Sequence, residues 1–500
     1  MKIHKKKVSQ LSLIAWTIIF TVILLCSYFV QAESTWTTTT LYTAKTPNQV
    51  YIKSYLKIFN DSMHVVVLYK NLINFSTDVV YIHTNNSLWQ TKTMEMHNIT
   101  IGSGYLSAID IYSPNYPNIC YYDQLDGNLY YAFWDGSEWL TMDIADFKGT
   151  KDTFGQHCTM IIDNKHIPHL FFYDQNRPLG LIYAYSDENF TNWFINAIDT
   201  GSGVGLEPSV TIDHNNKVLI SYFDHYHNNR SLRYAYFGKQ GTWIFHTIDA
   251  QGDAGHESSI TVDKHNNPHI SYFDKTNNNL KYAYSDGKNW SNQTIDSEGN
   301  VGSQSMIKID NINNPHIVYL NKTKENKIKY TYKDGLQWNF ITISNGSNPL
   351  LWVDEETTPH VIFESDGEIK YTRPDIWISS PATNTTFNTD QASTVIWSSQ
   401  QDISEVKIEL LEKNNENSIV ESKIINNTGL YTWMLPDSLQ SGDYQLKISS
   451  FSNENIYAFK NIHIENKSAP LANMSIIALI VVLIIVSIVL LLWFVLRRRK

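Results

Sequence analysis

The residue types best suited to chemistry recur at one place in the chain. His157, Glu207, Glu257 and Gln304 follow one another at intervals of 47 to 50 residues, and each stands two residues after a glycine. A carboxylate pair such as Glu207 and Glu257 could supply the acid and the base of glycoside hydrolysis if it flanked a sugar bond. Imidazole, carboxylate and amide groups could equally bind a sugar, a basic peptide or a cation.

These intervals belong to a repeated unit, which is clearest from Ser259 to Trp290. The segment holds three short alternations of apolar and polar residues separated by turn-forming residues, and a fourth begins at Trp290, as expected for four β-strands. In other units a Pro-His pair opens the second strand, a Tyr marks the third and a Trp opens the fourth. Repeats of roughly 40 to 50 residues are typical of propeller blades. The first strand is expected to close on Asp110, Asp163, Asp213, Asp263, Asp310 and Asp354.

The number of units predicts the fold class. Seven first strands can be counted, including a degenerate one at Leu56, and the seventh unit ends after its third strand at Arg373. The segment from Ser34 to Tyr42 matches the missing fourth strand in residue type and phase. Pairing it with the last unit would remove open sheet edges. We therefore predict an all-β protein in which residues 34–373 form a seven-bladed β-propeller closed by an N-terminal strand.

First strands are innermost in a propeller, so the polar residues near their starts should surround one mouth of the central channel. The four residues named first are joined there by Asn348, with His256 beside them and Lys53 as the match in the first unit. A second arc of carboxylates at the ends of the second strands should open on the same face. These groups could bind a glycan, a peptide or calcium, and a solvated funnel with turn-capping aspartates is the structural alternative. The second arc consists of Asp123, Asp174, Asp224 and Asp274.

The repeated residues themselves are expected to build the blades. An Asp followed by Asn-Asn-Pro-His is typical of a hairpin turn with its own side-chain hydrogen bonds. The recurring Trp and Tyr residues should fill the space between blades. The recurring His residues are separated by whole blades, so we assign them to no metal site.

Three turns carry a further signature. Asp135-Gly-Ser-Glu-Trp139, Asp286-Gly-Lys-Asn-Trp290 and Asp334-Gly-Leu-Gln-Trp338 resemble shortened Asp-box turns, and the repeats resemble those of BNR/sialidase-like surface proteins. The resemblance implies the propeller fold, with glycan binding or cleavage among the functions that this fold supports. A true sialidase requires three arginines around the substrate carboxylate. Such a triad does not assemble from the arginines before the C-terminal tail, which are Arg177, Arg230, Arg233 and Arg373.

The pattern changes at Pro374. Short alternating strands separated by polar turns continue to residue 465, which is typical of an immunoglobulin-like β-sandwich. Ile376-Trp-Ile-Ser-Ser-Pro381, Val395-Ile-Trp397 and Gly429-Leu-Tyr-Thr-Trp433 resemble the Kre9/Knh1-like domain of Ser/Thr-rich anchored membrane proteins. The resemblance implies an accessory module near a surface anchor over residues 374–465.

Both ends of the chain carry membrane-related signals. Four lysines within the first seven residues precede an apolar run that reaches Val30, so residues 1–32 are predicted to be a signal peptide or else an uncleaved anchor. Residues 466–475 form a polar stalk, and the apolar segment 476–496 is long enough for one transmembrane helix. The basic tail 497–500 belongs in the cytoplasm. We expect a single-pass protein of the cell membrane with an extracellular propeller and sandwich.

Charge and cysteine content limit the partners. The net charge is −10, and eight of the 39 Lys and Arg lie in the two ends, so the part between them is more acidic still. Without a basic face, we expect no binding to nucleic acid. Frequent Asn-X-Ser/Thr sequons predict a glycoprotein. Cys120 and Cys158 could form one disulfide in an oxidising exterior or remain two buried thiols.

The main functional hypothesis is a membrane-anchored recognition or adhesion protein that binds an extracellular glycan or protein through one face of the propeller. The first alternative is a glycosidase or lyase that uses Glu207 and Glu257. The second is a structural component of the cell envelope. Calcium is the one cofactor that the acidic arcs suggest.

Overall fold

The computed structural model shows strands and no α-helix over the residues that it describes. Among these residues no helix is long and apolar enough to cross a membrane. The predicted signal peptide, residues 1–32, and the predicted transmembrane segment, residues 476–496, lie outside the described residues. The described residues are 34–44, 49–59, 62–71, 77–85, 88–96, 107–122, 129–145, 156–174, 180–188, 190, 192–225, 230–238, 241–400, 402–413 and 415–466.

The first 28 strands form seven four-stranded antiparallel sheets, numbered here in chain order by their first strand. The first sheet contains β2 (Gln49–Phe59), β3 (Ser62–Asn71), β4 (Thr77–Asn85) and β5 (Leu88–Met96). The second contains β6 (Ser107–Ser113), β7 (Tyr116–Tyr122), β8 (Leu129–Trp134) and β9 (Trp139–Ala145). The third contains β10 (Gln156–Ile162), β11 (Pro168–Asp174), β12 (Gly180–Ser186) and β13 (Trp193–Thr200).

The remaining sheets repeat the same order of strands. The fourth contains β14 (Val204–Ile212), β15 (Val218–Asp224), β16 (Ser231–Phe237) and β17 (Trp243–Asp249). The fifth contains β18 (Ala254–Val262), β19 (Pro268–Asp274), β20 (Asn279–Ser285) and β21 (Trp290–Asp296). The sixth contains β22 (Val301–Ile309), β23 (Pro315–Asn321), β24 (Lys327–Asp334) and β25 (Gln337–Asn345). The seventh contains β26 (Ser347–Val353), β27 (Pro359–Ser365), β28 (Glu368–Pro374) and β1 (Trp36–Thr43).

The seventh sheet takes its fourth strand from the start of the chain, as the sequence predicted. β1 pairs antiparallel with β28, and the register runs from Trp36 opposite Pro374 to Thr43 opposite Glu368. The Trp36 ring lies 5.7 Å from that of Tyr330 in the sixth sheet. The N-terminal strand thus completes a sheet that the rest of the chain leaves one strand short.

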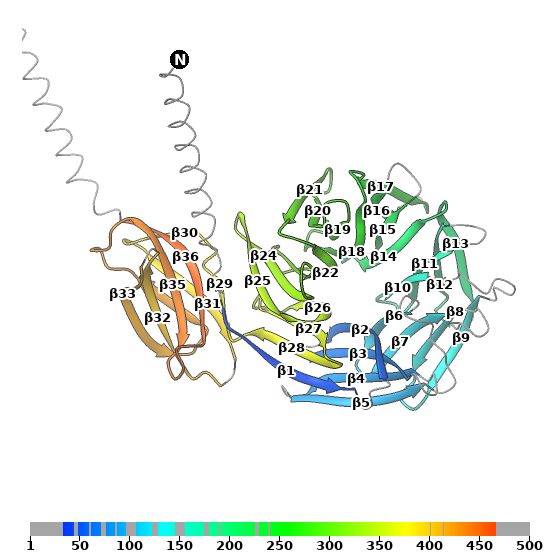
Figure 1. Ribbon diagram of the computed structural model, residues 1–500, viewed down its shortest axis with the longest axis horizontal. Helices are drawn as coiled ribbons and strands as arrows, with labels where there is room; N and C mark the ends of the chain where they lie inside the picture. The colour runs from blue at the N-terminus through cyan, green and yellow to red at the C-terminus, as the bar shows by residue number, and fades with distance from the viewer. Residues whose placement is uncertain are drawn as a thin grey trace, which may run out of the picture.

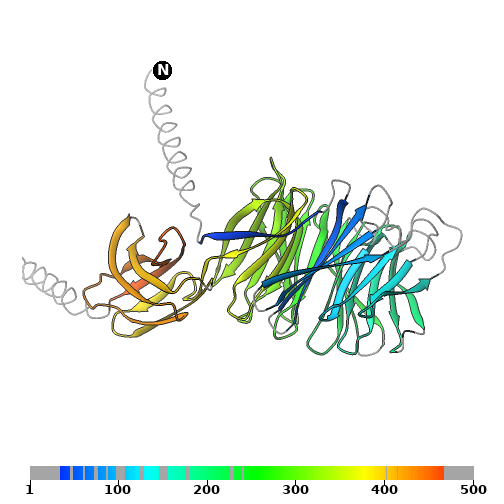
Figure 2. The ribbon, with the colours of Figure 1, turned by 90° about the horizontal axis from the view of Figure 1, so that it is seen from below.

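The seven sheets follow one another around a ring in a β-propeller-like arrangement (Figure 1), and Figure 2 shows the same sheets edge-on. First strands of consecutive sheets contact each other, and β26 of the seventh sheet contacts β2 of the first. Aromatic rings fill the space between sheets, as predicted: Tyr234 of the fourth sheet lies 5.0 Å from Trp290 of the fifth. Burial of such rings is the main apolar stabilisation between sheets.

Repeated aspartates build the turns after the first strands. Asp263 Oδ1 accepts hydrogen bonds of 2.8 Å from the amides of His265 and Asn267, and Asn266 adopts a left-handed φ of 65°. Asp110 departs from this pattern, so its predicted place was wrong. It lies inside β6, opposite Asn118, and the equivalent turn in the second sheet has Asn115 in the left-handed position.

The histidines of the Pro-His pairs join the strands within a sheet. His269 Nδ1 lies 2.6 Å from the Tyr282 hydroxyl, and His360 lies between Tyr371 and Asp354 at 2.7 and 3.1 Å. Burial lowers the pKa of His269 and His360 despite the neighbouring aspartates. These histidines therefore have the structural role that was predicted for them.

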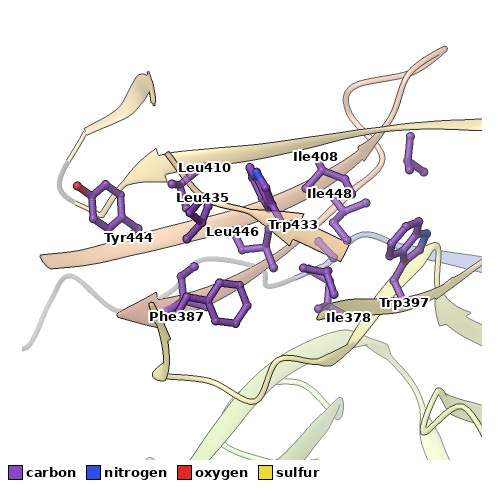
Figure 3. Packing of buried hydrophobic residues seen from close by; sticks show 14 of the residues in the cluster. Ile378, Phe387, Trp397, Ile408, Leu410, Trp433, Leu435, Tyr444, Leu446 and Ile448 are labelled. Carbon is purple, nitrogen blue, oxygen red and sulfur yellow. The ribbon is translucent and has the colours of Figure 1, made fainter. Parts of the chain in front are cut away.

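The C-terminal domain is an immunoglobulin-like β-sandwich. Three strands form one sheet, in the order β29 (Ile376–Ser380), β31 (Ala392–Ser399) and β34 (Leu430–Met434). Five form the other, in the order β30 (Thr385–Asn388), β36 (Tyr457–Glu465), β35 (Gly442–Ser450), β32 (Glu405–Glu412) and β33 (Asn415–Asn426). The two sheets enclose a core that includes Trp397 and Trp433 (Figure 3).

The sandwich is attached to the sixth and seventh sheets through buried contacts. Lys460 forms an ion pair with Asp334, which also accepts a 2.7 Å hydrogen bond from Thr383 Oγ1. The Trp377 ring lies 4.8 Å from Tyr332, and its indole N–H donates to Thr357 Oγ1. In the propeller, Asp334 ends a third strand and Thr357 lies in the turn after a first strand. Both residues are therefore at the end of the sheets opposite to the starts of the first strands.

Candidate functional site

The starts of the first strands carry the residues that were predicted to surround the mouth, and their backbone is unusual. Glu207, Glu257, Gln304 and Asn348 have φ values of 49°, 47°, 51° and 53°. Each stands at a break in the register between a first and a second strand. The glycine two residues earlier is required by close packing, because a Cβ on Gly255 would lie 2.7 Å from Leu232 Cα of the preceding sheet.

These four residues form a hydrogen-bonded chain from sheet to sheet. The amide of Glu257 donates to Glu207 Oε2 at 2.6 Å, the amide of Gln304 donates to Glu257 Oε2, and that of Asn348 donates to Gln304 Oε1 at 2.8 Å. Two residues further along, Ser209 Oγ accepts a hydrogen bond from the amide of Ile260. The predicted ring is therefore a set of connections between neighbouring sheets.

One junction in this ring holds additional charge. His256 Nδ1 lies 3.3 Å from Glu207 Oε2, and its Nε2 lies 3.0 Å from Asp253 Oδ1. The ring packs against Phe223 with 3.8 Å between centroids. Burial lowers the pKa of His256, but the hydrogen bonds and charges of Glu207 and Asp253 outweigh burial and raise the pKa above its ordinary value. Both ring nitrogens thus face carboxylates, which suits an imidazolium.

A fourth charged group completes this cluster. Arg230 Nη1 lies 3.0 Å from Asp253 Oδ2, and the arginine side chain is 50% exposed. Burial opposes ionisation of Asp253, yet the hydrogen bond from His256 and the charges of His256 and Arg230 hold its pKa below the ordinary value. We call Glu207, Asp253, His256 and Arg230 the junction cluster.

The junction cluster has no counterpart at the neighbouring junctions. His256 is paired opposite Phe273, and by the same register its place is taken by Leu206 in the fourth sheet, Ser303 in the sixth and Ser347 in the seventh. Among these four described junctions, only that of the fourth and fifth sheets therefore has a histidine held between two carboxylates. Groups with this much exposure and charge can bind a polar ligand.

Two predicted ring members contribute differently. Lys53 lies in β2 of the first sheet, opposite Leu68, and burial lowers the pKa of its ammonium group. His157 lies in β10, but its side chain is outside the described structure.

The second arc does not open on the surface as predicted. Asp174, Asp224 and Asp274 are 3%, 0% and 2% exposed, and Asp123 lies outside the described residues. Asp274 accepts hydrogen bonds from the amides of Thr276 and Asn277, which is the turn-capping alternative. Burial removes these carboxylates from direct contact with a large ligand.

The two glutamates considered as a catalytic pair also have a structural role. Glu207 and Glu257 each use one carboxylate oxygen to hold the amide of the next sheet. Among the described residues, no group of three or more His, Cys, Asp or Glu is placed to hold a metal ion. Of the two alternatives for Cys120 and Cys158, the structure has the buried free thiols, with their sulfur atoms 3.4 Å apart.

Sequence reasoning identified His256 and Glu207 but missed Asp253 and Arg230. Asp253 stands three residues before His256. The bulge at the start of the strand turns the chain so that the two side chains come within hydrogen-bonding distance. Arg230 belongs to the loop after β15 of the preceding sheet, so only the packing of the two sheets brings it to the cluster. One signal in the sequence was available for this cluster, because the position of His256 is held by small or apolar residues in the other units compared.

Comparison with known proteins supports the sandwich and gives distant structural likenesses. Residues 380–462 match the family model of the Kre9/KNH-like N-terminal Ig-like domain, which confirms that part of the resemblance. No curated protein matched the sequence. The chain is similar to a polysaccharide lyase, a PL25 ulvan lyase, with 12% identity, a TM-score of 0.49 and coverage of 66% of this chain and 94% of that one.

Two further solved structures are similar to the chain, with lower TM-scores. A protein of unknown function from Dyadobacter fermentans has 11% identity and a TM-score of 0.39, covering 69% of this chain and 99% of its own. The SapL1 lectin in complex with alpha methyl fucoside has 14% identity and a TM-score of 0.39, covering 61% of this chain and 97% of its own. These likenesses concern the fold, and we base no functional argument on them.

Proposed function

We propose that the chain is a membrane-anchored extracellular recognition protein that binds a glycan through the face of the ring bearing the junction cluster. In this proposal the seven sheets form a closed seven-bladed propeller, residues 476–496 form the anchor, and the sandwich connects the two. The recognition face would then be presented to the surroundings of the cell.

The junction cluster is the observation that carries the proposal. Arg230 is half exposed, and Glu207 and Asp253 retain 26% and 15% exposure of their side chains. Carboxylates accept hydrogen bonds from sugar hydroxyls, and a guanidinium donates to hydroxyl or carboxylate oxygens. Arg230 and His256 do not take part in the backbone connection at this junction, in which the amide of Glu257 donates to Glu207.

The attachment of the sandwich is consistent with this orientation. Asp334 and Thr357, which the sandwich contacts, lie at the turns that end third and first strands. The junction cluster lies near the starts of first strands, at the opposite end of the sheets. An anchor that follows the sandwich would therefore leave the face with the junction cluster unobstructed.

A glycan array probed with the detergent-solubilised full chain tests the proposal. We expect retention of one class of glycans, with a loss of about tenfold or more in Arg230→Ala, because charge-assisted hydrogen bonds contribute roughly 1.5–3 kcal/mol each. Lys264→Ala is the matched control, since Lys264 is exposed on a turn at the opposite end of the fifth sheet. Absence of glycan retention, or equal retention by Arg230→Ala, would contradict glycan recognition at this face; capture of a protein partner instead would support the protein-binding alternative.

A further inference from the structure

The C-terminal sandwich has an open sheet edge on the side away from the ring. Its five-stranded sheet ends in β33, which pairs with β32 and has no strand on its other side among the residues that the structure describes. Figure 1 shows β33 on the side of the sandwich away from the seven propeller sheets. The strand is 12 residues long and contains no proline. An open edge of this kind presents backbone N–H and C=O groups with which another strand can pair.

The side chains along this edge are partly apolar and exposed. Ile419, Val420 and Ile424 are 51%, 37% and 51% exposed, whereas Ile425 packs against the core of the sandwich. Exposed apolar side chains gathered on one edge strand add little to the stability of a single chain. They are typical of a surface that another molecule covers.

Two opposite charges lie between these apolar residues. Lys423 Nζ lies 3.7 Å from Glu421 Oε1, and the two side chains are 50% and 15% exposed. They stand two residues apart and therefore lie on the same face of the strand. Among the described residues, Glu421 Oε2 has no hydrogen-bond partner, so the carboxylate has capacity for a second ammonium group.

The order of these residues is complementary to itself when the strand is reversed. If two copies of β33 lie antiparallel with their Ser422 residues opposite each other, Glu421 of each copy lies opposite Lys423 of the other. In the same register, Val420 lies opposite Ile424. Opposite-charge pairs and apolar β-branched pairs stabilise neighbouring antiparallel strands. A lysine on an open edge normally discourages pairing, whereas here the reversed strand supplies its counterion.

We propose that β33 is a docking edge for a second copy of this chain, whose own β33 adds antiparallel and joins the two five-stranded sheets into one. The register between β32 and β33 shifts at Val420, and such a bulge interrupts pairing, so the paired stretch is Val420–Ile424. The edge lies in the sandwich and the junction cluster lies in the propeller. Pairing of copies and glycan recognition therefore fail independently.

The pairing determines the direction of the two chains. A two-fold axis between antiparallel edges reverses every strand of the joined sheet, so the two β36 strands end at its opposite ends. With the anchor proposed above, on which this step depends, the arrangement suits copies held by two facing membranes. The contact would then be one of adhesion between surfaces.

Sedimentation velocity of the detergent-solubilised full chain tests the pairing. We expect a dimer for the unaltered chain and self-association weaker by about tenfold or more in Lys423→Glu and in Glu421→Lys, because like charges then lie opposite each other. An equimolar mixture of these two variants should associate again, since each supplies the charge that the other lacks. Misfolded variants would not recover in this way. Lys264→Glu, on an exposed turn of the propeller, is the control and should dimerise as the unaltered chain does.

Cross-linking tests the register. Ser422→Cys places two thiols directly opposite each other, at a separation that a disulfide can span, so oxidised glutathione should convert this variant into a covalent dimer. Ser438→Cys, exposed in the loop after β34, should cross-link far more slowly. A monomeric unaltered chain, no association in the mixture of charge variants, or equal cross-linking of the two cysteine variants would overturn the proposal.

Clustering of phosphatidylcholine vesicles that carry the full chain tests the direction of the two copies. Vesicles with the unaltered chain should cluster, and those with Lys423→Glu should stay dispersed. Flotation of the chain with the vesicles checks the anchor separately. Vesicles that carry a dimerising chain and remain dispersed would contradict the facing arrangement.

Discussion

The amide of Glu257 donates a 2.6 Å hydrogen bond to Glu207 Oε2 across the boundary between the fourth and fifth sheets. The same carboxylate oxygen lies 3.3 Å from His256 Nδ1. One side chain therefore takes part both in the contact between sheets and in the charged cluster proposed for recognition. Substitutions that keep the acceptor oxygen can separate the two roles.

The first prediction concerns the connection between sheets. Glu207→Ala should lower the free energy of unfolding by about 1–3 kcal/mol, because the amide of Glu257 loses its acceptor in a partly buried place. Glu207→Gln keeps an acceptor oxygen and should be affected less. Denaturant titration measures both variants, with exposed Glu298→Ala as the control. Equal stability of the Ala variant and the control would show that the bond contributes nothing.

The second prediction concerns alkaline pH. The folded-state pKa of His256 is raised, so its stabilising effect is complete below the unfolded value of about 6.5 and is lost as the pH rises through the folded value. His256→Gln should remove this part of the pH dependence. Unfolding temperatures measured from pH 6 to 9 provide the test, and parallel curves for the two proteins would be the contradicting result.

The third prediction concerns acid. Burial lowers the pKa of His64 to about 4 and also lowers that of His269, so folding favours the neutral form of both side chains. The stabilisation by the neutral histidines is present above about pH 6.5 and is lost as the pH falls toward their folded-state pKa values. His269→Asn should flatten this loss, because Asn118 already occupies the same position in the second sheet and accepts the Tyr131 hydroxyl. Unfolding temperatures from pH 7 to 4 should show a shallower slope.

The sequence predicted the strands, their grouping and the partner of β1, because alternation and Trp spacing depend only on local burial. The sequence analysis misplaced Asp110, because it took the recurring aspartate to mark the same strand position in every unit. In the second sheet the first turn contains Asn115 and lacks the capping Asp, so the register, and not the aspartate, identifies equivalent residues. It also could not show that Glu207 and Glu257 bond to neighbouring amides, since those contacts join residues 50 positions apart and depend on the angle between sheets.

The fourth prediction concerns the domain interface. Lys460→Met leaves Asp334 buried without its ammonium partner and should destabilise the chain by about 3–5 kcal/mol. The double variant Lys460→Met with Asp334→Asn should be less destabilised than the sum of the two single variants. A double-mutant cycle of unfolding free energies measures this difference. Additive effects would mean that the two residues are not coupled.

The last prediction concerns β1. Deleting residues 35–44 would remove the fourth strand of the seventh sheet and expose the edge of β28, which pairs with it from Pro374 to Glu368. It would also remove Trp36, Leu41 and Tyr42 from the apolar clusters on which they pack. An exposed edge invites aggregation, so the deletion variant should unfold at a lower temperature and be cleaved faster by a protease. A synthetic peptide of residues 34–44 should restore protease resistance by pairing with β28, and a scrambled peptide of the same composition should not. Wild-type stability of the deletion variant would show that the ring does not depend on its N-terminal strand.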